Sequence, residues 1–489
     1  MLTLDRLSAA LEQADLQERH GRVRNLIGLV VEATGLQAQV GELCHIEIDT
    51  RGRRPAVPAE VVGFRDGATL LMPLGALAGI APGCAVTASG TELRVEVGNG
   101  LLGRVLDGLG RPMDGKGPVE ETIARPVTAS PPDPLTRPRI EDRIKLGVRA
   151  LDALIPCGRG QRLGIFAGSG VGKSSLLGMI ARNCSAQVNV IALVGERGRE
   201  VVEFLERDLG DALAHSVVIC ATSDQPALVR LKAAQTATAV AEHFRDAGAD
   251  VMLMMDSVTR FAMAQREVGL AVGEPPATRG YTPSVFAKLP ELLERSGTSP
   301  NGSITALYTV LVDGGDMDEP VADAVRGILD GHVVLTRELA HKAHYPAIDV
   351  LQSVSRLTGE ILTPDLQQAG QVVRELMSAY AEKEDLIAIG AYQPGSDPMV
   401  DRAIAAREGI QSFLRQRAEN GSSTDEADRF LRELAGMPQP VEPPAPVPGA
   451  GAGMYEAPDA GFIAGEAVLE GDSPTRQSAI PALGIDLNG

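Results

Sequence analysis

An eight-residue stretch, AGSGVGKS from Ala167 to Ser174, has the residue types of a phosphate-binding loop. It follows the apolar run LGIFA and leads into a helical stretch that reaches Arg182, so the expected order is strand, glycine-rich turn, helix. Glycines let backbone N–H groups converge on phosphate, and the amino end of the helix adds partial positive charge. The Lys173 ammonium can reach the β- and γ-phosphates, and the Ser174 hydroxyl can bind Mg²⁺. The loop therefore predicts a site for a nucleoside triphosphate and Mg²⁺.

The first position of this loop departs from the strict pattern, which has glycine where this chain has Ala167. We expect Ala167 to end the strand and to border the site without contacting phosphate. A glycine turn that merely happens to end in GKS is the alternative interpretation. The predicted nucleotide contacts are the loop and the start of its helix: Ala167, Gly168, Ser169, Gly170, Val171, Gly172, Lys173, Ser174 and Ser175.

Two carboxylates follow apolar strands at the positions where ligands bind in open α/β sheets. Asp256 ends the strand DVMLMMD, where it is placed to hold Mg²⁺ through water, whereas Asp250 begins that strand and should lie at the opposite edge. Glu196 follows the strand VIALVG, 23 residues after Lys173, and could polarise a water that attacks the γ-phosphate. A surface acid paired with Arg197 or Arg199 is an equally good interpretation of Glu196 from the residues alone.

An arginine is the remaining candidate for this chemistry. Arg356 follows the strand-like segment YPAIDVLQSVS, and an arginine supplied across a subunit boundary can neutralise charge that develops on the γ-phosphoryl group. Taken by itself, a surface arginine is the better interpretation of Arg356.

Composition favours a large, acidic protein. The chain has 489 residues, 44% of them hydrophobic, which is enough for two or three domains, and its formal net charge is -18. Negative charge disfavours binding to nucleic acid or to an anionic membrane. Five cysteines lie far apart and indicate reduced thiols, and no run is apolar enough for a signal peptide or a membrane span, so a cytoplasmic protein is expected.

Four segments surround or precede the core. Residues 1–20 have leucines at helical spacing and predict an amphipathic helix that either packs on its own domain or docks to a partner. Residues 21–92 contain short β-rich segments and predict a β-barrel, residues 370–436 are mostly helical, and residues 437–489 are rich in Pro, Ala and Gly and predict a disordered tail.

Between barrel and helical region, residues 93–369 alternate apolar strands with helices, which predicts an α/β domain built on a parallel sheet covered on both faces. The pair His341 and His344 in HKAH has no third ligand nearby in the sequence, so a solvated helix end is favoured over a metal site.

Several of these segments together resemble a known family. AGSGVGKS, GERGREV, MMDSVTRFAMAQREV, PPATRGYTPSVFAKLPELLERSG, LDGHVVLTREL and HYPAIDVLQSVSRL resemble, in order and spacing, the ATPases of flagellar and type III secretion export, which are relatives of the rotary ATP synthase α and β subunits. The resemblance runs from about Gly21 to Leu434. The segment GAYQPGSDPMVDRAI is more similar to the flagellar branch than to the virulence-secretion branch.

This resemblance implies a fold, an activity and a set of roles. The fold is a RecA-like P-loop ATPase core with an amino-terminal β-barrel and a carboxy-terminal helical domain, and the activity is ATP hydrolysis with Mg²⁺. Lys173 and Ser174 are then the P-loop pair, Glu196 the catalytic carboxylate, Asp256 the magnesium-side aspartate and Arg356 a finger for a neighbouring subunit. Arg197, next to Glu196, joins the nucleotide contacts.

The resemblance also implies partners. A homohexamer is expected, whose amino-terminal helix binds a stator-like regulator and which acts on chaperones and export substrates at an export gate. Association with the cytoplasmic membrane is then peripheral, through the export apparatus on its inner face, and no nucleic acid is bound.

Three other functions stay open from the sequence. A rotary ATP synthase subunit is weakened because the region from Arg356 to Gly436 is short and lacks a strongly acidic segment for a rotating shaft. A hexameric RNA translocase would need aromatic residues and a basic groove in its barrel, but residues 21–92 contain a single aromatic, Phe64. An inactive nucleotide-holding subunit would not need Glu196.

Overall fold

The structure of the chain, a computed structural model, describes residues 19–48 and 55–439. The expected helix of residues 1–20 lies outside them except for Arg19 and His20, where the expectation is wrong because these two residues begin strand β1. The expected disordered tail of residues 437–489 lies outside them from residue 440 onward.

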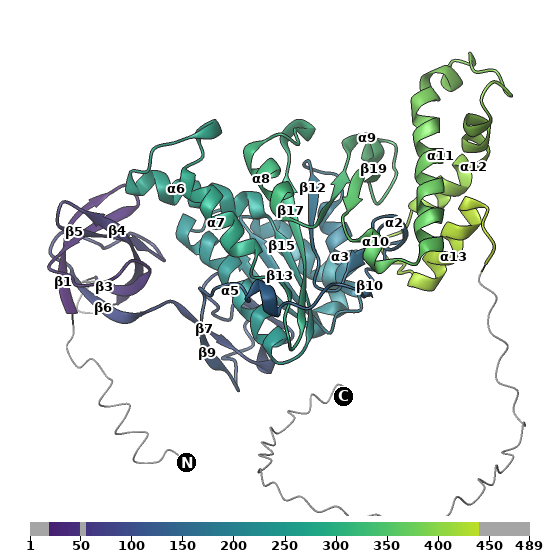
Figure 1. The fold of residues 1–489 in the computed structure, drawn as a ribbon. Coiled ribbons are helices and arrows are strands. Elements are labelled where there is room, and N and C mark those ends of the chain that lie inside the picture. The colour runs from purple at the N-terminus through teal and green to yellow at the C-terminus, as the bar shows by residue number, and fades with distance from the viewer. Residues whose placement is uncertain (1–18, 49–54, 440–489) are drawn as a thin grey trace, which may run out of the picture. The chain divides into compact units, whose positions relative to one another are not determined.

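The first described segment forms a closed barrel of six strands in the order β1-β2-β5-β4-β3-β6 (Figure 1, purple). Along β3 buried and partly exposed residues alternate, which directs Cys44 and Ile46 into the barrel core. The β-barrel that the short β-rich segments of residues 21–92 predict is confirmed. The strands are β1 (Arg19–Ile27), β2 (Val30–Thr34), β3 (Glu42–Glu47), β4 (Ala56–Arg65), β5 (Ala68–Pro73) and β6 (Ala85–Glu92).

A nine-stranded sheet forms the centre of the α/β domain, with the order β19-β18-β12-β17-β15-β13-β14-β8 and β16 paired to β17. Pairings from β18 to β8 are parallel, as predicted, whereas the edge strand β19 runs antiparallel to β18. The strands are β8 (Arg104–Asp107), β12 (Arg162–Ala167), β13 (Val188–Val194), β14 (Ser216–Ala221), β15 (Asp250–Asp256), β16 (Gly297–Thr298), β17 (Ser303–Leu311), β18 (Gly331–Leu335) and β19 (Ile348–Ser355).

Helices and two small two-stranded sheets accompany this sheet. The helices are α2 (Arg149–Leu154), α3 (Lys173–Asn183), α4 (Gly198–Glu203), α5 (Ala227–Asp246), α6 (Val258–Val272), α7 (Pro283–Leu293), α8 (Pro320–Ile328), α9 (Arg337–His341) and α10 (Thr358–Ile361). The small sheets are β7 (Arg94–Val97) with β9 (Ile123–Pro126) and β10 (Arg143–Ile144) with β11 (Cys157–Gly158). A π-helical turn, η3 (Phe204–Leu209), and short 3₁₀ turns complete the domain: η1 (Asn99–Leu101), η2 (Pro134–Thr136), η4 (Gly210–His215), η5 (Thr278–Gly280) and η6 (Asp313–Gly315).

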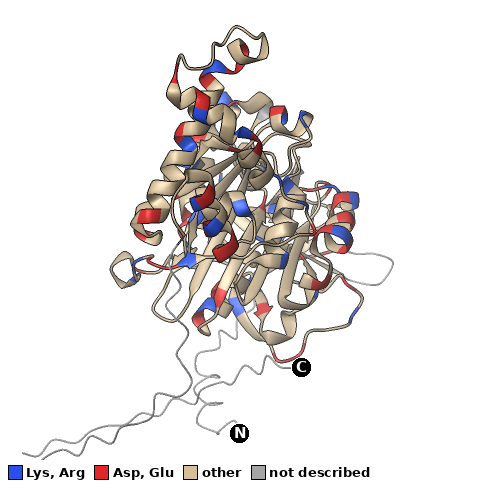
Figure 2. Cartoon of the chain, turned by 90° about the vertical axis from the view of Figure 1, so that its right-hand side faces the viewer, with Lys and Arg blue, Asp and Glu red and all other residues tan. Residues whose placement is uncertain are grey.

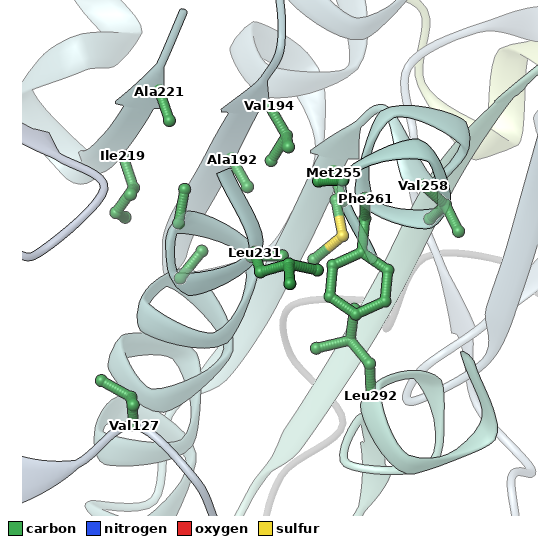
Figure 3. Close-up of a cluster of buried hydrophobic side chains, with 14 of the residues drawn as sticks. Val127, Ala192, Val194, Ile219, Ala221, Leu231, Met255, Val258, Phe261 and Leu292 are labelled. Carbon is green, nitrogen blue, oxygen red and sulfur yellow. The ribbon is translucent and has the colours of Figure 1, made fainter. Parts of the chain in front are cut away.

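The two faces of the sheet belong to two separate hydrophobic clusters. In β13, Ala192 and Val194 belong to the cluster under α5 and α6, and Ile191 and Leu193 to the cluster under α3. Figure 3 shows the first cluster, with Phe261 between the sheet and Leu292 of α7. Because successive strand side chains point to opposite faces, an unbroken apolar strand fills both cores at once.

The carboxy-terminal region is helical, as predicted, and consists of α11 (Pro364–Ala388), α12 (Pro398–Leu414) and α13 (Thr424–Ala435). Helix α11 begins six residues before the expected boundary at residue 370, because Pro364 at its first position fixes a helical φ. An ion pair of 2.8 Å between Arg143 and Asp428 joins this region to the α/β domain.

Three further features bear on the expectations from the sequence: surface charge, helices long enough to span a membrane, and His344. Basic and acidic residues alternate over the side shown in Figure 2, without a continuous basic face there. No helix among residues 19–48 and 55–439 is long and apolar enough to cross a membrane. His344 is only 5% exposed, so the expected solvated helix end is wrong at this residue, whose backbone N–H donates to the carbonyl of Leu339 in α9.

Candidate nucleotide site

The glycine-rich loop lies where the sequence predicts it, between β12 and α3. Gly170 and Gly172 have φ angles of 78° and 87°, a left-handed conformation that favours glycine, and these turns bring the chain from the sheet edge into the helix. Gly172 caps α3 without a side-chain hydrogen bond. The first N–H groups of the helix are therefore free of intrahelical acceptors and available to an anion.

A cavity of about 530 Å³ lies over this loop, within the size range of nucleotide-sized ligand sites. Nearly all the predicted contacts line it, with Val171 as the exception: Val171 is buried in the core beneath the loop and contributes no side chain to the cavity. The predicted residues on the wall are Ala167, Gly168, Ser169, Gly170, Gly172, Lys173, Ser174, Ser175, Glu196 and Arg197.

Lys173 lies between two carboxylates. Its Nζ is 2.5 Å from Oδ1 of Asp256 and 3.6 Å from Oε1 of Glu196. Burial alone would lower the pKa of Lys173, but the two carboxylates outweigh burial and raise its pKa, so the ammonium stays charged. The structure thus brings together three residues that are separated by up to 83 positions in the sequence.

Asp256 is fixed in this position by the neighbouring strand. The carboxylate is 3% exposed, and its Oδ1 also accepts a hydrogen bond of 2.8 Å from Oγ1 of Thr309 in β17. Asp250 lies at the other end of β15, as predicted, and pairs there with Arg159. The two aspartates of one strand therefore occupy opposite edges of the sheet.

Glu196 lies two residues beyond the end of β13, after Gly195, whose φ is 72°. Burial, and after it the negative charge of Asp256, raises the pKa of its carboxyl to about 7 against the opposing charge of Lys173. A carboxylate whose pKa is near neutrality can accept a proton at physiological pH. The alternative pairing with Arg197 or Arg199 is absent from the described ion pairs, where these arginines pair with Glu200 and Glu203.

Arg356 does not line this cavity. It follows β19, whose last residue Ser355 pairs with Gly331 at the start of β18, whereas the glycine-rich loop follows Ala167, which pairs with Leu335 at the other end of β18. The guanidinium is exposed and donates to the carbonyl of Arg326 at 3.3 Å. Arg356 therefore lies at the sheet edge opposite to the loop of its own chain.

Arg260 and Tyr345 are among the residues of the site that were not predicted. Arg260, at the start of α6, lines the cavity, and its Nε is buried without a hydrogen-bond partner among the described atoms. The ring of Tyr345 is 46% exposed and lies beside the loop, with its Cδ1 3.4 Å from where a Cβ on Gly172 would be. The signal for Arg260 was its place in the first turn after the strand of Asp256; Tyr345 had no local signal.

A metal would need ligands beyond those of the chain. No group of three or more His, Cys, Asp or Glu side chains that could hold a metal occurs in the described part of the chain. Ser174 on the cavity wall offers a hydroxyl. Asp256 offers a carboxylate that is buried and does not itself line the cavity, and the Lys173 ammonium beside it shows that this position favours a cation. These groups fit Mg²⁺ that is carried by a triphosphate and keeps several waters.

Comparisons with protein families match three consecutive parts of the chain. Residues 23–90 match the ATP synthase alpha/beta family, beta-barrel domain; residues 147–355 match the nucleotide-binding domain of the same family; and residues 362–433 match the T3SS EscN ATPase C-terminal domain. These ranges agree with the barrel, the α/β domain and the helical region of the structure.

Similar proteins span nearly the whole chain. The flagellum-specific ATP synthase of Bacillus subtilis is 54% identical over 427 residues, which are 87% of this chain and 97% of that protein. The flagellum-specific ATP synthase of Treponema pallidum is 51% identical, over 91% of this chain and 99% of that protein. The type 3 secretion system ATPase of Xanthomonas euvesicatoria is 50% identical, over 88% of this chain and 97% of that protein.

Solved structures agree in fold. The assembled ATPase EscN from the type III secretion system of enteropathogenic Escherichia coli aligns with a TM-score of 0.80 at 45% identity, covering 85% of this chain and all of that one. The same ATPase in complex with its central stalk EscO aligns with a TM-score of 0.78 at 46% identity, again over 85% of this chain and all of that one.

Proposed function

The chain belongs to the family of the flagellum-specific ATP synthases and type III secretion ATPases and is therefore an ATP hydrolase of protein export, and we propose that it energises flagellar export from composite sites between subunits. The observation that supports this mechanism is the convergence of Lys173, Glu196 and Asp256 at the glycine-rich loop. ATP is the substrate, and water is the acceptor of its γ-phosphoryl group.

Each residue of this set has a distinct task. On ATP binding the Lys173 ammonium transfers from the carboxylates to the β- and γ-phosphates, which replaces one pair of negative partners by another. Glu196, freed of this ion pair, orients a water and accepts its proton as the oxygen attacks phosphorus. Arg197 and Arg260 add positive charge to the walls of the cavity.

Ser174 and Asp256 would hold Mg²⁺, which, when bound, neutralises charge on the β- and γ-phosphates. Thr309 fixes the Asp256 carboxylate by its hydrogen bond, so the carboxylate is already oriented before substrate arrives.

The position of Arg356 supports a ring. An exposed arginine at the sheet edge opposite to its own loop is placed to serve the site of the next subunit. A homohexamer closes such head-to-tail contacts and has one composite site at each interface. The assembled form of the similar ATPase EscN supports this arrangement.

Partners of the ring follow from the same premise. We expect contact with a stator-like regulator through the expected helix of residues 1–20, most of which lies outside the described residues. We also expect contact with a central stalk like EscO, the central stalk of EscN. Docking at the inner face of the cytoplasmic membrane would then occur through the export apparatus, where chaperones and export substrates are delivered.

Complementation tests this function. A strain that lacks the gene is given either the wild-type chain or the Glu196→Gln variant, and flagellin in the medium is measured together with growth on a respiratory substrate. Flagellin export restored by the wild type alone, with unchanged growth, supports the proposal. Unchanged export with failed respiratory growth would replace it by the rotary synthase function, and secretion of virulence proteins without flagellin would place the chain in the other branch.

The raised pKa of Glu196 predicts an acid limb in the pH profile of kcat/KM. Only the deprotonated carboxylate accepts a proton, so kcat/KM should fall as pH decreases below about 7, where burial and Asp256 place the pKa. Glu200→Gln removes a second negative neighbour that raises this pKa and should move the limb to lower pH. A flat wild-type profile between about pH 6 and pH 8 would contradict the role of Glu196 as base.

Tyr345 is predicted to hold the adenine ring. Its half-exposed ring beside Gly172 offers an aromatic face next to the phosphate loop, and stacking on such a face is worth about 1–3 kcal/mol per base. Tyr345→Ala should raise KM for ATP about tenfold with little change in kcat, whereas Tyr345→Phe should keep the wild-type KM. Equal KM values for all three proteins, measured by steady-state hydrolysis, would place the adenine elsewhere.

A further inference from the structure

Gln161 is a buried polar residue for which the nucleotide cavity has no direct use. It is 0% exposed and lies immediately before β12, at the end of this strand opposite to the glycine-rich loop. Its Oε1 accepts the N–H of Gly158 at 2.7 Å, and its Nε2 donates to the carbonyl of Asp330 at 3.0 Å and to Oγ of Ser355 at 3.1 Å. Both hydrogens of the amide group are therefore committed.

Both acceptors of this amide lie next to the backbone of Arg356. Ser355 precedes Arg356 directly, and the carbonyl of Asp330 that accepts from Gln161 also accepts the backbone N–H of Arg356 at 3.0 Å. The Gln161 side chain thus contacts both the residue before Arg356 and the carbonyl that accepts the backbone N–H of Arg356. We propose that Gln161 is a positioning residue for Arg356, an inference that rests on the proposed role of Arg356 at the neighbouring site.

The next residue strengthens this anchor. The Arg162 Nε is 3.1 Å from Oδ2 of Asp330, and the backbone N–H of Asp330 donates to the carbonyl of Arg162 at 2.9 Å. Residues 161 and 162 therefore hold Asp330 through its carbonyl, its N–H and its carboxylate. β12 continues from here to the glycine-rich loop. The strand that ends at the nucleotide site of one subunit therefore also fixes, at its other end, the backbone of the arginine that this subunit donates to its neighbour.

The Arg356 side chain itself has few restraints. It makes no ion pair among the described residues and has only the hydrogen bond to the carbonyl of Arg326. Its direction is therefore set chiefly by the backbone from which it projects. Because a displacement of about 1 Å at a catalytic group can reduce a rate by up to about 10²-fold, the rigidity of this backbone has consequences for turnover.

A double-mutant cycle tests the proposal. Gln161→Leu keeps the approximate volume and removes the three hydrogen bonds, and we expect kcat to fall about tenfold while KM for ATP changes less than about twofold, since Arg356 acts on the transition state. In a chain that already carries Arg356→Ala, the same substitution should cause no further loss of kcat. Ser355→Ala, which leaves Gln161 in place, should lower kcat by a smaller factor and be equally silent in the Arg356→Ala chain.

Thr305→Val is the matched control. Oγ1 of Thr305 accepts the backbone N–H of Gly160, which precedes Gln161 in the same turn, at 2.8 Å, and has no described hydrogen bond with Asp330 or Ser355. The Thr305→Val substitution should therefore leave kcat unchanged. The proposal is wrong if Gln161→Leu and Ser355→Ala lower kcat by the same factor with and without Arg356. It is also wrong if Thr305→Val lowers kcat as much as Gln161→Leu does, because Gln161 would then only stabilise the turn. If Arg356→Ala by itself leaves kcat unchanged, the proposed finger fails first, and the two failures are distinguished.

Discussion

Glu196→Gln should reduce kcat by about 10³-fold while ATP still binds with nearly its original affinity. The amide has the size of the carboxylate but cannot accept the proton of the attacking water. The contacts to the phosphates come from the loop, Lys173 and the cavity arginines, and none of them depends on the charge of Glu196. Removing that charge relieves one of two negative partners of Lys173, so affinity should if anything increase slightly.

The measurement is single-turnover hydrolysis together with equilibrium binding of ATP. Glu203→Gln is the matched control, because Glu203 is a half-exposed carboxylate at the end of α4 that pairs with Arg199 at 3.3 Å and does not line the cavity. It should hydrolyse ATP at the wild-type rate. Undiminished turnover in Glu196→Gln would show that another group accepts the proton.

Arg356→Ala should produce a loss of similar size, about 10³-fold in kcat, without loss of ATP binding by the separate subunit. The guanidinium meets the γ-phosphoryl charge only in the transition state and only from the next subunit, so it contributes little to the ground-state complex. Arg356→Lys should restore little of the rate, since a single ammonium lacks the planar set of donors that a guanidinium presents to phosphate oxygens.

Arg326→Ala controls for the loss of a positive charge on this edge. Arg326 lies nearby, pairs with Asp323 at 2.7 Å, and offers Arg356 only its backbone carbonyl, which the substitution keeps. Its kcat should stay within about twofold of wild type. A kcat for Arg356→Ala that equals that of Arg326→Ala would leave Arg356 as an ordinary surface residue.

Local patterns in the sequence account for much of the site. Strand, glycine turn and helix follow one another directly around Lys173, and the apolar run before Asp256 identifies the strand and the edge at which its carboxylate emerges. The short β-rich segments of residues 21–92 likewise predict the barrel. Each of these inferences needs only neighbours in the chain, because period and turn chemistry are local properties.

The remainder depends on contacts between distant residues. Thr309 meets Asp256 from 53 positions away, and Gln161 meets Ser355 from 194 positions away. Because β19 is antiparallel to β18, Arg356 lies at the sheet edge opposite to the glycine-rich loop. The residues of β19 do not indicate in which direction this strand runs. His344 is buried, although the three residues before it, His341 to Ala343, are exposed. These features depend on tertiary packing, so local sequence patterns could not predict them.

Mixing two inactive variants tests the composite site most directly. Glu196→Gln supplies an intact Arg356, and Arg356→Ala supplies an intact loop and Glu196, so an interface that joins them in one order contains every catalytic group. Each variant alone should be nearly inactive, and an equal mixture should recover roughly a quarter of the wild-type activity, the fraction of complete interfaces in randomly mixed rings. Hydrolysis by the mixture that stays at the level of the separate variants, while mixed rings form, would contradict a site completed by the neighbouring subunit.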